Sequence, residues 1–393
     1  MSDRQNSSRA DPPSDGIEGA TALPLAYRRL VAKIGSNILG GREGLDLEVM
    51  AALVAQLANL RKAGAEVILV TSGAVLAGRR ILGDPKERRD LPFRQVLAAV
   101  GQSRLMYVYD LLFSWHGVTI AQALLTKRDL SDRQGYLNTR NTLLGLLDLG
   151  VITIVNENDV VATEELEGSA FGDNDTLSAL VANLVDADLL VLLTDTEGLY
   201  TADPHLDANA RLIPRVDRID ASIEALAGQA GEGGGTGGMA TKVQAARLAT
   251  SAGATVVIAS GREQQVLPRL ARGEVIGTLF PAAGTRLESR KRWMLAGLSA
   301  RGRLVVDGGA AVALQREHRS LLPAGVLSIE GDFQRGDAVT LVGPDGAALG
   351  YGIANYGATD MAVIRGRRSD RINALLGYDH GAEVVHRNNF VGI

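Results

Sequence analysis

Short apolar runs alternate with longer segments of helical pattern through the first two thirds of the chain. The apolar runs are rich in β-branched residues and lie at 30–34, 67–71, 118–121, 151–156, 189–194 and 255–259. The helical segments between them include 46–62, 95–113, 133–149, 176–185 and 241–251. A strand that is apolar along its whole length is buried on both faces. The alternation therefore predicts an α/β fold, with an open, mostly parallel sheet sandwiched by helices.

The pattern changes after residue 290. Strand-like runs follow at 304–306, 326–329, 338–342 and 382–386, separated by turn signals such as Asp307-Gly308-Gly309. Several short strands between turn residues are typical of a small β-rich domain. We therefore predict a first domain at 27–286, a connecting segment at 287–298 and a β-rich domain at 299–393.

The remaining composition narrows the location and the partners. Residues 1–26 are polar, lack the apolar segment of a signal peptide and predict a disordered leader. The chain has no cysteine, which removes disulfides and thiolate chemistry and agrees with a cytoplasmic protein. A net charge of −4 gives no general reason to expect nucleic acid or membrane as a partner. The longest stretch without a charged residue, 111–126, is too short to span a membrane.

Polar and glycine-rich clusters follow the predicted strands, at 33–37, 71–74, 156–159, 172–176 and 194–204. Open parallel sheets bind their ligands at the carboxyl ends of the strands. Lys33 is informative because an unpaired charge late in a buried strand is costly. It predicts either a phosphate ligand or a lysine that snorkels to solvent at the end of the sheet.

Two of these clusters also have simpler structural explanations. Residues 156–159 suit a zwitterionic ligand, with Asp159 facing an ammonium group, but an Asx turn with a helix cap uses the same residue types. Residues 172–176 open a helix, and one of their carboxylates is expected to be an N-cap. Three such polar residues in a row exceed what capping needs, so at least one is predicted to be functional.

A glycine-rich loop at 233–238 leads into a helix that carries Lys242 in its first turn. The backbone amides of such a loop and a nearby lysine can hold phosphate. The loop is not a P-loop, because the chain contains no Gly-x-x-x-x-Gly-Lys-Ser/Thr sequence. No predicted strand precedes it, as a dinucleotide-binding loop requires, and the protein-kinase motifs are absent.

Taken together, the clusters resemble the amino acid kinase family, in the form that carries a C-terminal PUA domain. The resemblance covers the chain from about Leu30 to its C-terminus. It rests on five stretches in register: TSGAVLAG at 71–78, VNENDVVAT at 155–163, GDNDTLSAL at 172–180, LTDTEGLYTADP at 193–204 and GTGGMATK at 235–242. Each stretch alone is a weak signal, whereas five in this order are specific.

The resemblance implies ATP-dependent phosphorylation of the γ-carboxylate of L-glutamate, the first step of proline biosynthesis. It implies that Lys33 and Lys242 neutralise charge on the transferring phosphoryl group and that Asp175 holds both lysines. The residues implied to contact glutamate are Ser72, Asp159 and Asn174. Those implied to bind ATP are Lys33, Thr194, Asp195, Thr236, Gly237, Gly238, Met239, Ala240, Thr241 and Lys242. Mg²⁺ is implied as a companion of the nucleotide, and no residue is predicted to ligate a metal directly.

The same resemblance implies further partners. These are proline as a feedback inhibitor, a second copy of the chain in a homo-oligomer, and glutamate-5-semialdehyde dehydrogenase for hand-off of the product. PUA domains elsewhere bind RNA, but residues 299–393 hold ten Lys and Arg and ten Asp and Glu residues. A domain without net positive charge is a poor general RNA binder, so RNA is not expected as a partner.

Two alternatives stay open, and the chain departs from the family in three places. Within the same fold, the acceptor is acetylglutamate, aspartate or a nucleoside monophosphate; outside it, the chain is a nucleotide-binding regulator without activity. The first loop reads Gly35-Ser36-Asn37, where relatives usually have Thr-Ser after the glycine. Residues 164–171 are acidic where relatives often carry a basic residue, which implies altered substrate affinity or feedback inhibition. The leader at 1–26 has no counterpart.

Overall fold

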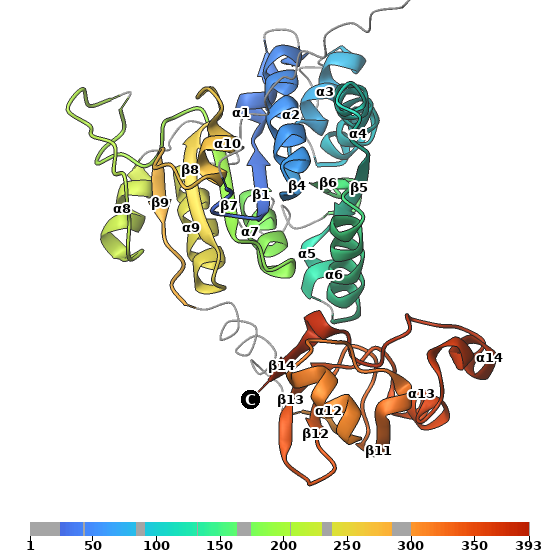
Figure 1. Ribbon diagram of the computed structural model, residues 1–393. Helices are drawn as coiled ribbons and strands as arrows, with labels where there is room; N and C mark the ends of the chain where they lie inside the picture. Colours follow the sequence, from blue (N-terminus) through green and yellow to red (C-terminus); the bar gives the residue numbers. More distant parts are fainter. Residues whose placement is uncertain are drawn as a thin grey trace, which may run out of the picture.

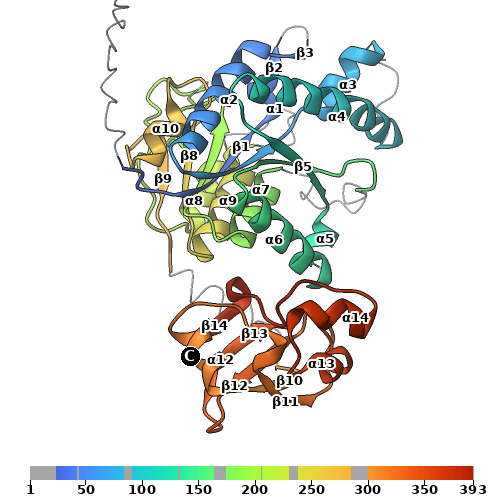
Figure 2. The same ribbon diagram turned by 45° about the vertical axis from the view of Figure 1, so that its right-hand side comes forward.

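The computed structural model describes residues 24–41, 44–83, 91–131, 133–162, 174–204, 206–229, 238–284 and 300–392. They form an α/β body up to residue 284 and a β-rich body from residue 300 (Figures 1 and 2). The connecting segment predicted at 287–298 and most of the predicted leader lie outside the described residues. The domain boundaries therefore stay a prediction.

A seven-stranded sheet lies at the centre of the first body. Its strands are β1 (Arg29–Ile34), β4 (Glu66–Thr71), β5 (Ile120–Leu125), β6 (Ile152–Glu157), β7 (Leu189–Thr194), β8 (Thr255–Ser260) and β9 (Thr278–Phe280). Their order is β5-β6-β4-β1-β7-β8-β9, and only the pair β8–β9 is antiparallel. The predicted mostly parallel α/β sheet is confirmed.

Helices cover both faces of this sheet. One face carries α1 (Ser36–Leu39), α2 (Leu47–Lys62), α3 (Ala74–Leu82), α4 (Leu91–Ser114) and α10 (Val266–Ala271). The other carries α5 (Lys127–Ser131), α6 (Arg133–Asp148), α7 (Asn174–Leu184), α8 (Ala221–Gln229) and α9 (Met239–Ser251). A short ribbon of β2 (Gly40–Gly41) and β3 (Gly44–Leu45) precedes α2.

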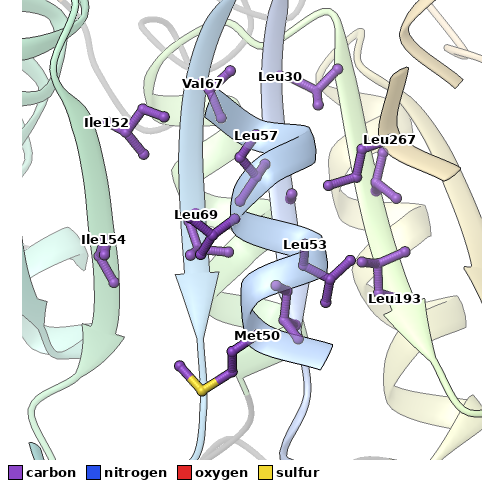
Figure 3. Close-up of a cluster of buried hydrophobic side chains, with 14 of the residues drawn as sticks. Leu30, Met50, Leu53, Leu57, Val67, Leu69, Ile152, Ile154, Leu193 and Leu267 are labelled. Carbon is purple, nitrogen blue, oxygen red and sulfur yellow. The ribbon is translucent and has the colours of Figure 1, made fainter. Parts of the chain in front are cut away.

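The central strands are apolar because each of their side chains enters one of two cores. Successive residues of a strand point to opposite faces, so Leu30 belongs to the core under α2 and Val31 to the core under α7 and α9. Figure 3 shows the first of these cores, where Met50, Leu53 and Leu57 of α2 lie over the strands. Their spacing of three and four residues places them on one face of the helix.

Two predicted strands differ from the structure. The strand expected at 118–121 begins at Ile120, because the Val118 amide donates to the Phe113 carbonyl and so belongs to the turn that ends α4. The strand expected at 382–386 is wrong: this segment forms a single bridge between Val385 and Leu321. Apolar residues in an extended loop that crosses a core produce the same sequence pattern as a strand.

The β-rich body has a five-stranded sheet and a core of its own. Its strands are β10 (Gly302–Val306), β11 (Val326–Gly331), β12 (Ala338–Val342), β13 (Ala348–Ile353) and β14 (Phe390–Gly392), in the order β11-β10-β12-β13-β14. Its helices are α12 (Gly308–Gln315), α13 (Ala358–Ile364) and α14 (Ile372–Leu376). The core includes Leu304, Leu341 and Tyr356.

Helix α6 carries the contact between the two bodies, and both views show it directed at the β-rich sheet (Figures 1 and 2). Leu137 of α6 packs with Ala338, Ile353 and Val391. One turn further on, Arg140 is 3% exposed. Its Nε donates to Asn389 Oδ1 at 3.0 Å, its Nη2 lies 2.6 Å from Asp186 Oδ2, and its Nη1 donates to the Leu184 carbonyl.

Among the described residues, no helix has both the length and the apolar character that crossing a bilayer requires.

We expect Arg140→Met to lower the free energy of unfolding by about 3–5 kcal/mol, because it removes the charged donor that binds Asp186, Asn389 and the Leu184 carbonyl in a buried place. Urea denaturation followed by circular dichroism measures this loss. The matched control is Arg215→Met, which breaks an exposed 2.7 Å pair with Asp217 and should cost under about 0.5 kcal/mol. Equal losses in the two variants would contradict a docking role for Arg140.

Candidate functional site

The carboxyl ends of the central strands bring the predicted site residues together. Lys33 near the end of β1 is aligned with Val70 on β4 and with Leu192 on β7. Ser72 therefore follows on one side of β1, and Thr194 ends β7 on the other. Ligands bind at this edge of an open parallel sheet. The topology thus places residues from distant parts of the sequence around β1.

A buried cluster of three charges lies at this edge. Lys33 Nζ is 2.6 Å from Asp175 Oδ1, and Lys242 Nζ is 3.1 Å from Asp175 Oδ2. All three side chains are buried, with 3%, 0% and 5% of Lys33, Asp175 and Lys242 exposed. The snorkelling alternative for Lys33 is therefore wrong. Two ammonium groups against one carboxylate leave a net positive charge next to the sheet.

The carboxyl group of Asp175 is held in its charged form. Burial alone would raise its pKa, but the nearby charges of Lys33 and Lys242 outweigh burial and hold the pKa below its usual range. Hydrogen bonds from Lys33 and from the Thr241 hydroxyl, which is 2.9 Å from Oδ2, act in the same direction. Asp175 thus remains ionised and is the counter-charge of both lysines.

Two helices deliver Asp175 and Lys242. Helix α7 begins at Asn174, so Asp175 lies in its first turn. Helix α9 begins at Met239 after Gly238, and Lys242 lies one turn into it. The amino ends of both helices thus lie at the cluster, where their dipoles favour an anion. Asp175 is not the N-cap expected among the carboxylates of 172–176, because its side chain binds the lysines, and Asp173 lies outside the described residues.

Four polar side chains form a second network beside the charges. Asn174 Nδ2 donates to Ser72 Oγ at 3.0 Å and to Asn156 Oδ1 at 3.2 Å. Asn156, which is 2% exposed, donates from Nδ2 to Gln102 Oε1 at 2.8 Å. Ser72 and Asn174 were predicted from the resemblance, and the structure brings them into direct contact. Their role in binding stays a prediction.

The other predicted residues lie nearby or outside the described chain. Thr194 Oγ1 donates to Asp195 Oδ1 at 3.0 Å, and Asn37 Nδ2 lies 3.3 Å from Asp195 Oδ2, which joins the ends of β7 and β1. Asp159 is half-buried, two residues after β6. Met239, Ala240 and Thr241 form the first turn of α9 with Lys242. Thr236, Gly237 and the acidic segment 164–171 lie outside the described residues.

Two residues of α4 at this site were missed. Gln102 bonds Asn156, and the Tyr109 hydroxyl is 2.8 Å from Thr71 Oγ1 at the end of β4. Burial raises the pKa of Tyr109 far above its usual value, against the lowering effect of the Thr71 hydrogen bond. The two residues are seven positions apart, which places them on one helix face. Polar residues seven positions apart within the helical pattern at 95–113 could have indicated this part of the site from sequence.

The described residues contain no group of three or more His, Asp or Glu side chains placed to hold a metal ion. The carboxylate nearest the centre of the site, that of Asp175, is already engaged by two lysines. This donor set does not fit a resident divalent cation. It fits an anionic ligand that brings its own cation.

The chain is similar to known proteins over both of its bodies. Residues 28–260 match the family model "Amino acid kinase family", and residues 302–376 match that of the PUA domain. A glutamate 5-kinase from Dehalococcoides mccartyi is 54% identical over 368 residues, 93% of this chain and 99% of that protein. One from Herpetosiphon aurantiacus is 52% identical over 366 residues, with 93% and 98% covered. A solved UMP kinase from Bacillus anthracis covers 66% of this chain and 97% of its own, at 14% identity and a TM-score of 0.47.

We expect Asp175→Asn to lower the free energy of unfolding by about 3–5 kcal/mol at pH 7, because two buried ammonium groups lose their counter-charge. The pKa of Asp175 is lower in the folded state than in the unfolded one, so its contribution is complete above the unfolded value of about 3.9. It is lost as the pH falls through the folded pKa.

The difference in stability between the wild-type protein and the variant should therefore be larger at pH 7 than at pH 3, and it should narrow as the pH falls below about 4. Urea titrations across this range measure the difference. Asp217→Asn, at the exposed pair with Arg215, is the control and should stay within about 0.5 kcal/mol of wild type. A difference that persists unchanged at pH 3 would contradict the ion cluster.

Proposed function

This chain belongs to the amino acid kinase family, and we propose that it transfers the γ-phosphoryl group of ATP to the side-chain carboxylate of L-glutamate, the first step of proline biosynthesis. The observation that carries the proposal is the buried cluster of Lys33, Asp175 and Lys242 at the carboxyl edge of the sheet. Relatives above 50% identity over nearly the whole chain, named glutamate 5-kinases, supply the acceptor.

The chemistry needs no general base. A glutamate side chain has a pKa of about 4.3, so its carboxylate is already ionised at neutral pH. One of its oxygens attacks the γ-phosphorus, and the bond from that phosphorus to the β,γ-bridging oxygen breaks, with its electron pair leaving on ADP. Phosphoryl transfer of this kind depends on positioning and on fixed positive charge around the equatorial oxygens.

Each part of the site has a place in this reaction. Lys33 and Lys242 stabilise negative charge on the transferring group, and Asp175 holds the two ammonium groups apart at fixed positions. Glutamate is bound by Ser72, Asp159 and Asn174. ATP is bound by Thr194, Asp195 and residues 236–242.

Mg²⁺ enters with the nucleotide as MgATP, because substrate phosphates together with one or two carboxylates are its usual ligands in phosphoryl-transfer sites. Bound to the phosphates, Mg²⁺ would neutralise the negative charge that the two lysines do not compensate. We place the enzyme in the cytoplasm, where ATP is available. Proline as a feedback inhibitor, assembly with further copies of the chain, and hand-off of the reactive acyl phosphate to glutamate-5-semialdehyde dehydrogenase complete the proposal.

The β-rich body is not proposed to bind RNA. Its basic cluster of Arg365, Arg367, Arg368 and Arg371 is exposed, and Arg368 pairs with Asp370 at 3.2 Å. A solvated cluster within a domain of balanced charge supplies little phosphate neutralisation.

We expect the purified protein to form a hydroxamate from L-glutamate in the presence of MgATP and hydroxylamine, because hydroxylamine traps an acyl phosphate. N-acetylglutamate, aspartate and nucleoside monophosphates are offered in parallel, with ADP release as the second readout. Hydroxamate from another acid alone would keep the phosphoryl-transfer site and replace the acceptor. ADP release with a nucleotide acceptor alone would overturn the proposed reaction.

We expect Lys33→Met and Lys242→Met each to lower kcat by about 10²–10³, by analogy with the loss of one preorganised charge-stabilising donor. The matched control is Lys62→Met, an exposed lysine at the end of α2, which should leave kcat unchanged. Steady-state kinetics at saturating glutamate and ATP measure the effect. Wild-type turnover in either site variant would remove that lysine from the mechanism.

A further inference from the structure

We propose that Gln102 of α4 is a specificity-determining residue for the acceptor, and that its side-chain Nε2 donates a hydrogen bond to the α-carboxylate of the bound amino acid. The inference rests on the proposed function, since it names a further contact of the same acceptor. Three observations carry it: a chain of amides with one possible polarity, a buried donor left over at its end, and a helix held in place to present that donor.

The polarity of the amide chain follows from one backbone group. The Glu157 amide can only donate, and it lies 2.9 Å from Asn156 Oδ1. Asn156 must therefore present Nδ2 to its other neighbour, Gln102, at 2.8 Å. Gln102 accepts this bond with Oε1, which leaves its Nε2 facing away from Asn156.

The Glu157 amide also fixes the orientation of the Asn174 side chain. Because Asn156 Oδ1 is an acceptor, Asn174 must present Nδ2 to it, at 3.2 Å, and the same Nδ2 reaches Ser72 Oγ at 3.0 Å. Asn174 Oδ1 then faces the opposite way. One main-chain N–H thus determines the orientation of three side-chain amides.

Two buried atoms are left over at the ends of this chain. Gln102 Nε2 and Asn174 Oδ1 are both inaccessible to solvent, and neither has a hydrogen-bond partner among the described residues. Buried polar atoms in folded proteins are almost always paired. The leftover donor, Gln102 Nε2, matches the carboxylate on the α-carbon of an amino acid, which accepts hydrogen bonds.

The reacting γ-carboxylate of the acceptor lies away from the Gln102 end of this network. The γ-carboxylate must lie toward Lys33 and Lys242, where the phosphoryl group is transferred. Asn174 directly precedes Asp175 in α7, so the amide chain begins beside the lysines and runs through Asn156 to Gln102. The α-carboxylate therefore falls to the far end of the chain, where Nε2 is the donor.

Helix α4 is built to aim residues at this edge of the sheet. Gln95, Gln102 and Tyr109 are spaced by seven positions, two helical turns, and lie on one face. Gln95 Nε2 donates to the Ala162 carbonyl at 3.1 Å, Gln102 accepts from Asn156, and Tyr109 bonds Thr71. One face of one helix thus reaches the segments after β6 and the end of β4.

Helix α4 also packs closely against α3. A Cβ at Gly101 would overlap the Ala74 carbonyl oxygen of α3, and one at Gly78 of α3 would overlap the Leu97 carbonyl oxygen of α4. The backbones of the two helices therefore touch at both glycines. Gln102 follows Gly101 directly, so its Cα lies next to a close backbone contact between α3 and α4.

The test uses Gln102→Glu, Gln102→Met and the exposed neighbour Ser103→Ala as control. Glutamate at 102 keeps an oxygen for Asn156 but replaces the donor with an anionic oxygen. We expect its KM for L-glutamate to rise at least tenfold, and at least as much as in Gln102→Met. The KM for ATP should stay close to wild type, and Ser103→Ala should match wild type throughout.

A wild-type KM for L-glutamate in Gln102→Glu would overturn the proposal, because it would limit Gln102 to supporting Asn156 through its oxygen. A parallel rise in the KM for ATP would overturn it as well. If Gln102→Glu does not fold, Gln102→Met is compared on L-glutamate and on 4-aminobutyrate, which lacks the α-carboxylate. Its kcat/KM should fall at least fivefold more for L-glutamate, and equal losses would contradict the contact.

The two levels of failure are separable. If the wild-type protein forms no hydroxamate from L-glutamate, the proposed function has failed before any variant is assayed. If it does so and Gln102→Glu retains the wild-type KM, the function stands and only the role of Gln102 is lost.

Discussion

The burial of one carboxylate between two ammonium groups is the constraint around which the rest of the site is arranged. Removing three charges from water is expensive unless they are paired. Asp175 is the counter-charge that pairs Lys33 and Lys242, both of which are almost fully buried. The surplus positive charge that results lies at the carboxyl edge of the sheet, where open parallel sheets bind their ligands. The fold must therefore bring β1, α7 and α9 together before any phosphate can bind.

Much of this fold was predictable from sequence because the central strands have no solvent-facing side. Their unbroken apolar runs predicted the parallel sheet, and Lys33 stood out as a charge inside such a run. Strands with a weaker pattern were placed less well: the outermost strand β5 is only half-buried along most of its length. The extended segment 382–386 has strand composition because it crosses a core, although it pairs at one position only.

The site was predictable in part, for a different reason. Lys33, Asp175 and Lys242 follow from motifs that keep their neighbours in sequence, and their meeting at 2.6 and 3.1 Å agrees with the contact that the resemblance implied. Gln102 and Arg140 carry no such motif. A glutamine or an arginine on a helix resembles any solvent-facing residue until the helix is placed. Each becomes informative only when a partner more than 40 positions away, Asn156 for Gln102 and Asn389 for Arg140, lies against it.

The two halves of the site thus solve different physical problems. The attraction between a phosphoryl group and a cation has no preferred direction. For the two lysines held by one carboxylate, position therefore matters more than orientation. Recognition of an amino acid needs direction, because its carboxylate is an anion that accepts hydrogen bonds and its ammonium is a cation that donates them. A network of amides can supply that direction, but each amide can be turned by half a revolution unless something fixes it. The Glu157 N–H removes this freedom for Asn156, Asn174 and Gln102 together, so a single backbone group at the end of β6 orients all three amides.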